Sequence, residues 1–180
     1  KTIGLGIMYG MGKGKLADQL GVDVEEASDI LMRFNTYAPF VRQMADTVMR
    51  SATTRGYIKT LLGRRCHFDM WEPRQYGTGR PMKYKEAMHE YNGDIKRAFV
   101  YKALNKLIQG SAADMTKKAM LDCYNASYKP LLQVHDELVF SVSDKREVEG
   151  IVKIMEAAVE LEVPNKVDAE LGKNWGDSMS

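Results

Sequence analysis

Two adjacent acidic residues, Asp136 and Glu137, end the run Gln133-Val134-His135-Asp136-Glu137, which lies between two apolar stretches. Carboxylates held near a core are costly unless a positive group neutralises them. A hard divalent cation such as Mg²⁺ takes oxygen ligands and usually bridges to phosphates, so Asp136 is a candidate metal ligand that needs a second carboxylate. An ordinary surface β-turn explains the acidic pair equally well, and these residues alone leave both interpretations open.

Lys1, Leu5 and Tyr9 are spaced four residues apart in the glycine-rich start of the chain. In a helix they would lie within about 80° of one another, which gives one face a cation, an apolar platform and an aromatic hydroxyl. Such a face suits a triphosphate at one end and a stacked base at the other. The glycines match neither GxGxxG nor GxxxxGK[ST]. Taken alone, the pattern favours an interior helix, because apolar helix faces are usually core.

Asn105 and Gln109 lie four residues apart in a predicted helix and therefore share a face, with Lys102 on a neighbouring face. Amides beside a cation suit contacts to sugars, phosphates and base edges. An exposed polar stripe is an equally good explanation of these residues.

The elements that must position these side chains follow from hydrophobic periodicity. Apolar residues at three- and four-residue spacing predict helices over residues 23–37, 39–55 and 146–161, with Asp23 as an N-cap. Residues 1–11 are a helix or a glycine-rich loop, and Gly12 and Gly14 break the chain. A hairpin is predicted from strands 57–61 and 65–68, then an irregular insertion over 69–81. Helix is predicted from 82 to about 124, with a break at Gly93 left open.

Residues 131–134 and 138–142 are predicted strands on either side of the acidic run, and residues 167–171 a last short strand. The order of helices first, then strands and a helix, indicates an α+β fold. We expect a helical region, followed by part of an antiparallel sheet with packed helices.

Composition places the chain in the globular range, with 44% hydrophobic and 28% charged residues. The net charge of +2 is unevenly spread: residues 129–180 carry 6 basic and 11 acidic side chains, so the preceding residues carry 20 and 13. A basic front part suits a polyanion, although charge asymmetry barely outweighs an ordinary solvated surface. Cys66 and Cys123 lack zinc-site spacing and are expected to be free thiols. No apolar run reaches the roughly 20 residues that a membrane span needs.

Five segments occur in an order that resembles family A DNA polymerases, the DNA polymerase I type. The run from Lys1 to Tyr9-Gly10 resembles the second half of motif B, and Gln133-Val-His-Asp-Glu-Leu138 resembles motif C. Three further segments match the family's GY…T…GRR stretch, its N-x3-QG-x-AAD helix and its usual ending: Gly56 to Arg65, Ala103 to Asp114, and Gly172 to Trp175. The resemblance covers the chain nearly end to end, with residues 66–97 as a divergent insertion.

The resemblance implies a role for each matching residue. Lys1 would neutralise the incoming triphosphate and protonate the leaving pyrophosphate, and Tyr9 would stack near the templating or the nascent base pair. Asp136 would be a catalytic carboxylate for two Mg²⁺ ions, and Glu137 would assist it. Asn105 and Gln109 would touch the minor groove of the primer–template, where shared acceptors allow pair shape to be checked. The other DNA contacts implied, to the primer terminus or the backbone, are Gln133, His135, Arg64, Arg65 and Lys102.

Two departures from the family pattern affect these expectations. Leu5 stands where the family usually has Phe or Tyr, so we expect altered handling of nucleotides that lack the 3′-hydroxyl. Tyr101 stands where the family has an arginine, four residues before Asn105. Leucine at position 5 leans toward a phage-type enzyme, which is an argument by analogy.

Motif A, with the partner aspartate, would precede Lys1, so the resemblance implies the C-terminal part of a polymerase. We expect residues 1–55 to be fingers, 56–128 to join fingers and palm, and 129–180 to be palm. The expected partners are primer–template DNA, deoxynucleoside triphosphates (dNTPs) and an N-terminal polymerase portion, from the same native chain or a separate subunit. A split gene, an intein or a truncation would each leave such a piece, inactive alone, in the cytoplasm of a bacterial or phage-infected cell.

Two other classes of protein are rivals. A non-catalytic nucleic-acid-binding module with a degenerate polymerase fold would tolerate the loss of Asp136. A small metal-dependent phosphohydrolase would need further ligands, and the histidines at 67, 89 and 135 show no ligand spacing.

Overall fold

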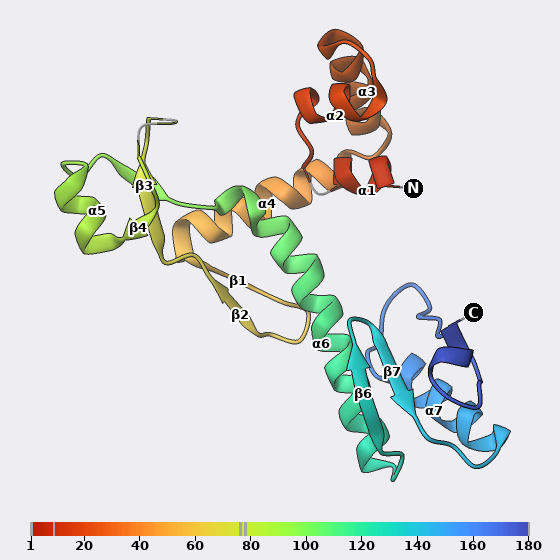
Figure 1. The fold of residues 1–180 in the computed structure, drawn as a ribbon. Helices are drawn as coiled ribbons and strands as arrows, with labels where there is room; N and C mark the ends of the chain where they lie inside the picture. The colour runs from red at the N-terminus through yellow and green to blue at the C-terminus, as the bar shows by residue number, and fades with distance from the viewer. Residues whose placement is uncertain (1, 9, 76, 78, 180) are drawn as a thin grey trace. The chain divides into compact units, whose positions relative to one another are not determined.

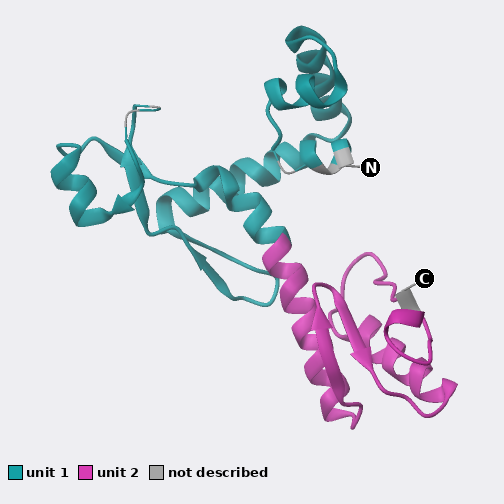
Figure 2. Cartoon of the chain, in the orientation of Figure 1, with its two compact units in different colours: residues 1–108 teal, residues 109–180 magenta. Residues whose placement is uncertain are grey.

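The computed structural model describes residues 2–8, 10–75, 77 and 79–179, and its helices and small antiparallel sheets confirm the α+β class (Figure 1). The chain divides into two compact units, Lys1–Ile108 and Gln109–Ser180 (Figure 2). Helix α6, Ala103–Asn125, begins in unit 1 and continues into unit 2.

Four helices open unit 1: α1 (Thr2–Met8), α2 (Lys13–Leu20), α3 (Val24–Tyr37) and α4 (Pro39–Arg55). For the start of the chain, where a helix or a glycine-rich loop was expected, the structure has a helix. The predicted break is confirmed at Gly12, which is the N-cap of α2 in the stretch between α1 and α2, and is wrong at Gly14, which lies within α2. Burial of Leu16 and Ala17 in a cluster with Ala27 offsets the cost of a helical glycine.

The predicted ends of α3 and α4 are confirmed. The Asp23 side chain accepts a hydrogen bond from the Glu26 amide at 2.8 Å, which is an N-cap of α3. Pro39 occupies the first turn of α4, where its missing N–H costs nothing. Gly56 ends α4 with a positive φ of 78°, a backbone conformation that glycine adopts without strain.

A hairpin follows α4, as predicted, from β1 (Tyr57–Lys59) and β2 (Arg65–His67). One side of it belongs to the core of unit 1, where Ile58 packs with Ala52, Phe68 and Ala103. This apolar contact fixes the hairpin to α4 and to the start of α6.

The secondary structure of residues 70–102 differs from two predictions. The stretch expected to be irregular contains strand β3 (Met70–Pro73). The stretch expected to be helical, with a break at Gly93 left open, contains β4 (Met82–Lys83), α5 (Tyr84–Glu90), β5 (Ile95–Arg97) and the 3₁₀ turn η1 (Val100–Lys102). The three strands form an antiparallel sheet in the order β4-β3-β5. The contacts of Trp71 explain the error: across the sheet it meets the guanidinium of Arg97 at 4.5 Å, and it meets the ring of Tyr84, at the start of α5, at 5.1 Å. Partners so far apart in sequence leave no local periodicity.

Unit 2 contains β6 (Pro130–Val134), β7 (Glu137–Phe140), α7 (Lys145–Ala157) and the 3₁₀ turn η2 (Gly176–Met179). The two predicted strands and the amphipathic helix are confirmed, although α7 ends four residues early. The strand predicted at 167–171 is absent from the described residues. The Val167 amide donates to the Glu156 carboxylate at 3.2 Å, so α7 takes a hydrogen bond that a strand partner would otherwise take.

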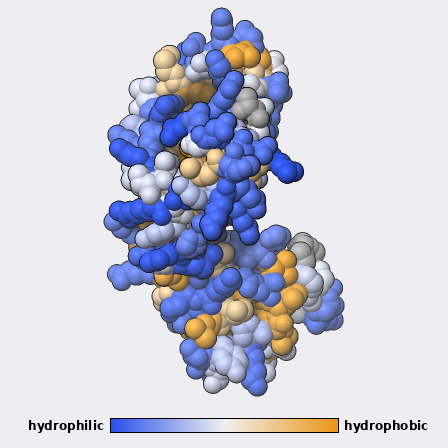
Figure 3. Space-filling view, turned by 90° about the vertical axis from the view of Figure 1, so that its left-hand side faces the viewer, coloured by the Kyte–Doolittle hydropathy of each residue, from blue (hydrophilic) through white to orange (hydrophobic). Residues whose placement is uncertain are grey.

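Exposed apolar side chains occur in both units, and Figure 3 shows them as separate orange patches among hydrophilic ones. In unit 2 they include Leu121, Tyr124, Leu131 and Leu132. No helix in the described part of the chain is both long enough and apolar enough to cross a bilayer.

Candidate functional site

The acidic run lies at the turn of a hairpin between β6 and β7, as predicted, although the turn has two residues and not three, because Glu137 is the first residue of β7. Val134 pairs with Glu137 across the hairpin, which leaves His135 and Asp136 at the tip. His135 has φ 53°, in the left-handed region that non-glycine residues rarely adopt. The side chains of His135, Asp136 and Glu137 are all exposed. The backbone thus holds the acidic pair at the end of the hairpin, outside the core.

Gln133 supports this turn from within β6. Its side-chain Nε2 donates a hydrogen bond to the carbonyl oxygen of His135 at 3.2 Å. The His135 carbonyl, at the tip of the turn, therefore accepts a hydrogen bond from within the hairpin. This hydrogen bond joins Gln133 and His135, which are both predicted DNA contacts.

The donors at this turn have the chemistry of a magnesium site, since carboxylate oxygens are what that ion prefers. The described residues hold no group of three His, Cys, Asp or Glu side chains close enough to bind one metal ion. Asp136 and Glu137 therefore fit part of a site, and a complete site needs a carboxylate from elsewhere.

Asn105 and Gln109 are both exposed on α6, on the opposite side from the buried Ala103 and Leu104. Their four-residue spacing gives them one face, as predicted. Lys102 precedes the helix, with its ammonium 4.9 Å from the centre of the Phe99 ring and 5.6 Å from that of Tyr101. Tyr101, which stands at the family's arginine position, is 68% exposed.

Arg64 lies in the turn of the β1–β2 hairpin, and Arg65 is the first residue of β2. The Arg64 amide donates to the Thr60 hydroxyl at 3.0 Å, and the Thr60 amide donates to the Arg64 carbonyl at 2.9 Å. Arg65 lies over the Tyr57 ring at 4.6 Å. Two bonds to one buried threonine therefore define the turn that presents both arginines.

The third predicted group, at the start of the chain, is only partly described. Lys1 and Tyr9 lie outside the described residues. Leu5 lies within α1, the helix that the four-residue spacing requires. For this group, the helix is established and the side-chain face stays a prediction.

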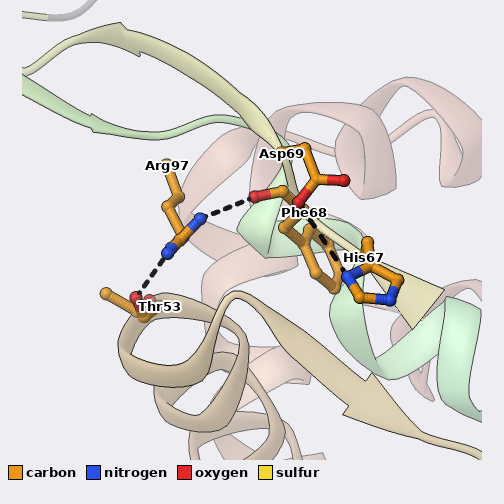
Figure 4. A network of polar contacts seen from close by, with 5 residues as sticks. All are labelled: Thr53, His67, Phe68, Asp69 and Arg97. Carbon is orange, nitrogen blue, oxygen red and sulfur yellow. Dashed lines mark hydrogen bonds and ion pairs between the residues drawn. The ribbon is translucent and has the colours of Figure 1, made fainter. Parts of the chain in front are cut away.

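Two residues that hold the β1–β2 hairpin in position, Arg97 and Thr60, were not predicted from the sequence. Arg97 donates from Nε to the Thr53 carbonyl at 3.1 Å and from Nη1 to the Phe68 carbonyl at 3.0 Å, as Figure 4 shows. It joins the end of α4 to the end of the hairpin, across 44 residues of sequence. No local pattern could have found it. Thr60, in contrast, is signalled by its place four residues before Arg64 at a turn.

Cys123 adds no nucleophile to the site. Both thiols are free, Cys66 half-buried and Cys123 buried. Burial, and then the neighbouring Asp122 carboxylate, raise the pKa of the Cys123 thiol. The group therefore stays protonated and unreactive at neutral pH.

Comparisons with known proteins give one consistent result. Residues 1–177 match the model of DNA polymerase family A. The chain is 34% identical to a DNA-directed DNA polymerase of Pseudomonas phage M6, over 99% of this chain and 29% of that protein. It is also 34% identical to DNA polymerase I of Geobacillus stearothermophilus, over 99% of this chain and 19% of that protein.

A solved structure extends the likeness to three dimensions. The POL domain of Pol1 from M. smegmatis, in complex with DNA primer-template and dNTP, is similar with a TM-score of 0.76 and 30% sequence identity. The match covers 99% of this chain and 30% of that one. This chain thus spans less than a third of each of these proteins.

Proposed function

Because the chain belongs to DNA polymerase family A, as its motifs predict, we propose that it is the C-terminal part of a template-directed DNA polymerase. The exposed turn that carries Asp136 is the observation on which this proposal depends most. The relatives are much longer than this chain, which supports a further polymerase portion that completes the enzyme.

The proposed reaction is transfer of a nucleotide from a dNTP to a primer 3′-end. The primer 3′-oxygen forms a bond to the α-phosphorus, and the bond from that phosphorus to the pyrophosphate oxygen breaks. The 3′-hydroxyl loses a proton, and the leaving pyrophosphate gains one. The M. smegmatis POL domain was solved with primer-template and dNTP, which supports the same substrates here.

Asp136 would hold Mg²⁺ together with a carboxylate from the remaining polymerase portion, and Glu137 would assist from the adjacent position. Two bound Mg²⁺ ions would supply positive charge for the attacking and leaving oxygens of the displacement. The exposure of Asp136 supports this role, because a carboxylate at a turn can reach an ion without first losing its water inside a core.

The nucleotide would be bound at α1. Lys1 would neutralise the triphosphate and supply the proton to pyrophosphate, and Tyr9 would stack on the nascent base pair. Leu5, between them, would set how the sugar 3′-hydroxyl is recognised. Location of Leu5 in a helix supports this arrangement.

The DNA would be held by two kinds of contact. Asn105 and Gln109 would bind minor-groove acceptors that all base pairs share, and their common exposed helix face supports this. The remaining residues would contact the primer terminus, in the case of Gln133 and His135, or backbone phosphates, in the case of Arg64, Arg65 and Lys102.

We assign residues 1–55 to the fingers, 129–180 to the palm and 56–128 to the connection between them. This division concerns function, and it cuts the chain at other points than the boundary between the two compact units.

Substitution of Asp136 tests the proposal in the polymerase that contains this chain. We expect Asp136→Asn to lower the rate of primer extension with Mg²⁺ at least about 10²-fold, because charge stabilisation in the transition state is lost. Affinity for primer–template should stay within about threefold, since one carboxylate adds nothing to phosphate binding. Single-turnover extension and DNA titration measure the two quantities.

Glu137→Gln is the matched control, with an expected loss of about tenfold, because a supporting carboxylate contributes less than a ligand. Full activity in Asp136→Asn would contradict the proposal. It would favour the alternative of a nucleic-acid-binding module that does not use this turn for catalysis.

A further inference from the structure

The hairpin of β1 and β2 has two unlike faces. Side chains alternate along a strand, and the register pairs Tyr57 with His67, Ile58 with Cys66 and Lys59 with Arg65. Ile58 and Cys66 pack toward the core of unit 1. The opposite face carries Tyr57, Lys59, Arg65 and His67, which we call the cationic hairpin face.

The backbone under this face is fixed at both ends. At the turn, Thr60 and Arg64 exchange the hydrogen bonds described above. At the base, the Phe68 amide donates to the Gly56 carbonyl at 2.8 Å, and Arg97 holds the Phe68 carbonyl and the end of α4 (Figure 4). A binding surface on such a support loses little entropy when it takes a ligand.

Lys59 and Arg65 are directly opposite each other on this face, and both are exposed. Like charges in a cross-strand pair destabilise a sheet. Among the ion pairs of the described residues, none involves either side chain, and the nearby Asp69 carboxylate lies 3.9 Å from Nδ1 of His67. The face thus keeps two cations together without an acidic partner.

Tyr57 explains how one of these cations is held. The Arg65 guanidinium carbon lies 4.6 Å from the centre of the Tyr57 ring, and the His67 ring lies 5.9 Å from it on the neighbouring strand. A ring face attracts a guanidinium but does not neutralise it. Arg65 is therefore restrained while its charge stays available to an anion.

We propose that the cationic hairpin face binds backbone phosphates of DNA, with Lys59 and Arg65 as paired cations and Tyr57 as the residue that positions Arg65. This rests on the proposed function and adds Lys59 and Tyr57 to it. Arginine suits bidentate phosphate binding, and lysine supplies a point charge beside it. The contact is independent of base sequence, because it involves phosphates alone.

Replacement of Lys59 by an acid is expected to raise the melting temperature and to lower the affinity for DNA. Lys59→Glu places an acid opposite Arg65, so the melting temperature of the polymerase should rise by about 1–4 °C. Affinity for a primer–template should fall at least about tenfold near 0.1 M salt, because a phosphate contact becomes a repulsion. Lys59→Gln should reduce the slope of log affinity against log salt by about 1. Lys85→Gln, an exposed lysine on α5, is the control and should change neither quantity.

Tyr57→Leu tests the positioning role, with Tyr57→Phe as its conservative partner. Leucine removes the ring, so affinity should fall about two- to fivefold, whereas phenylalanine keeps a ring and should restore wild-type affinity. Blunt duplex and single-stranded oligonucleotides, titrated separately, show which form of DNA uses the face.

An unchanged salt slope in Lys59→Gln, or the same reduction in Lys85→Gln, would overturn the proposal. So would wild-type affinity in Tyr57→Leu. Asp136-dependent primer extension by the wild-type polymerase would leave the proposed function intact, while failure of the wild-type polymerase to extend a primer would contradict that function instead.

Discussion

His135 combines a rare backbone conformation with a place beside the candidate metal ligand. Its φ of 53° costs an ordinary residue roughly 1–2 kcal/mol, because Cβ approaches the following carbonyl. Strain of this kind persists where the surrounding structure enforces it. The two-residue turn itself accounts for this conformation, because such turns favour positive φ, and the proposed role of the imidazole near the primer terminus is a separate contribution.

Replacement of His135 separates these two contributions. We expect His135→Gly to raise the free energy of unfolding by about 0.5–1 kcal/mol, because relief of strain exceeds the added chain entropy. His135→Ala keeps the strain and should not stabilise the protein. Both variants should lose primer-extension rate to a similar extent, since both lack the ring. Denaturant unfolding and primer extension are the measurements, and equal unfolding free energies in the two variants would contradict the strain argument.

For single residues, the sequence predicts well a site whose parts are neighbours in sequence, and poorly a site whose parts are far apart in sequence. The turn at Asp136 follows from two flanking apolar runs, and the Asp23 cap from its position before a helical pattern. The carboxylate that must complete a metal site has no local signal near Asp136. Arg97 is similar, because its partners Thr53 and Phe68 lie 44 and 29 residues away.

The elements that were predicted correctly are those whose stability is largely local. Helices α3, α4 and α7 have regular apolar spacing and end at a cap, a proline or a glycine, which are short-range signals. The sheet of β3, β4 and β5 was missed because its short strands depend on contacts of Trp71 with Arg97 on β5 and with Tyr84 at the start of α5. Helix α2 was missed because burial of Leu16 outweighs the cost of Gly14 within the helix.

Gly56 is the junction between α4 and the hairpin, and it is subject to two constraints. Its φ is 78°, and a Cβ there would lie 2.8 Å from the Arg97 guanidinium carbon. We expect Gly56→Ala to lower the free energy of unfolding by about 2–3 kcal/mol, from left-handed strain plus displacement of Arg97. Gly63→Ala is the matched control, with φ 88° and open space around the added Cβ, and should cost about 1 kcal/mol. Equal losses in the two variants would show that Arg97 does not crowd this position.

On the scale of the whole molecule, the chain exposes apolar surface where a sheet would normally be covered. The β6–β7 pair is a two-stranded sheet, which is marginal by itself. Leu131 is 66% exposed and Leu132 is 43% exposed on β6, and Leu121 and Tyr124 are exposed on α6. A sheet face that carries apolar side chains is normally packed against another element. Because the relatives are several times longer, we expect further polymerase sequence to cover these side chains.

Leu131→Glu tests this expectation in the polymerase that contains the chain. If Leu131 is buried there, the variant should lose about 2–3 kcal/mol of unfolding free energy, from the lost apolar burial and a carboxylate without a partner. Val163→Glu is the control: Val163 is 73% exposed outside the helices and strands, and its replacement should cost less than about 0.5 kcal/mol. Denaturant unfolding compares the two. A loss in Leu131→Glu no larger than that in Val163→Glu would mean that this face stays in water in the complete enzyme, and that the remaining polymerase sequence supplies its carboxylate without packing on β6.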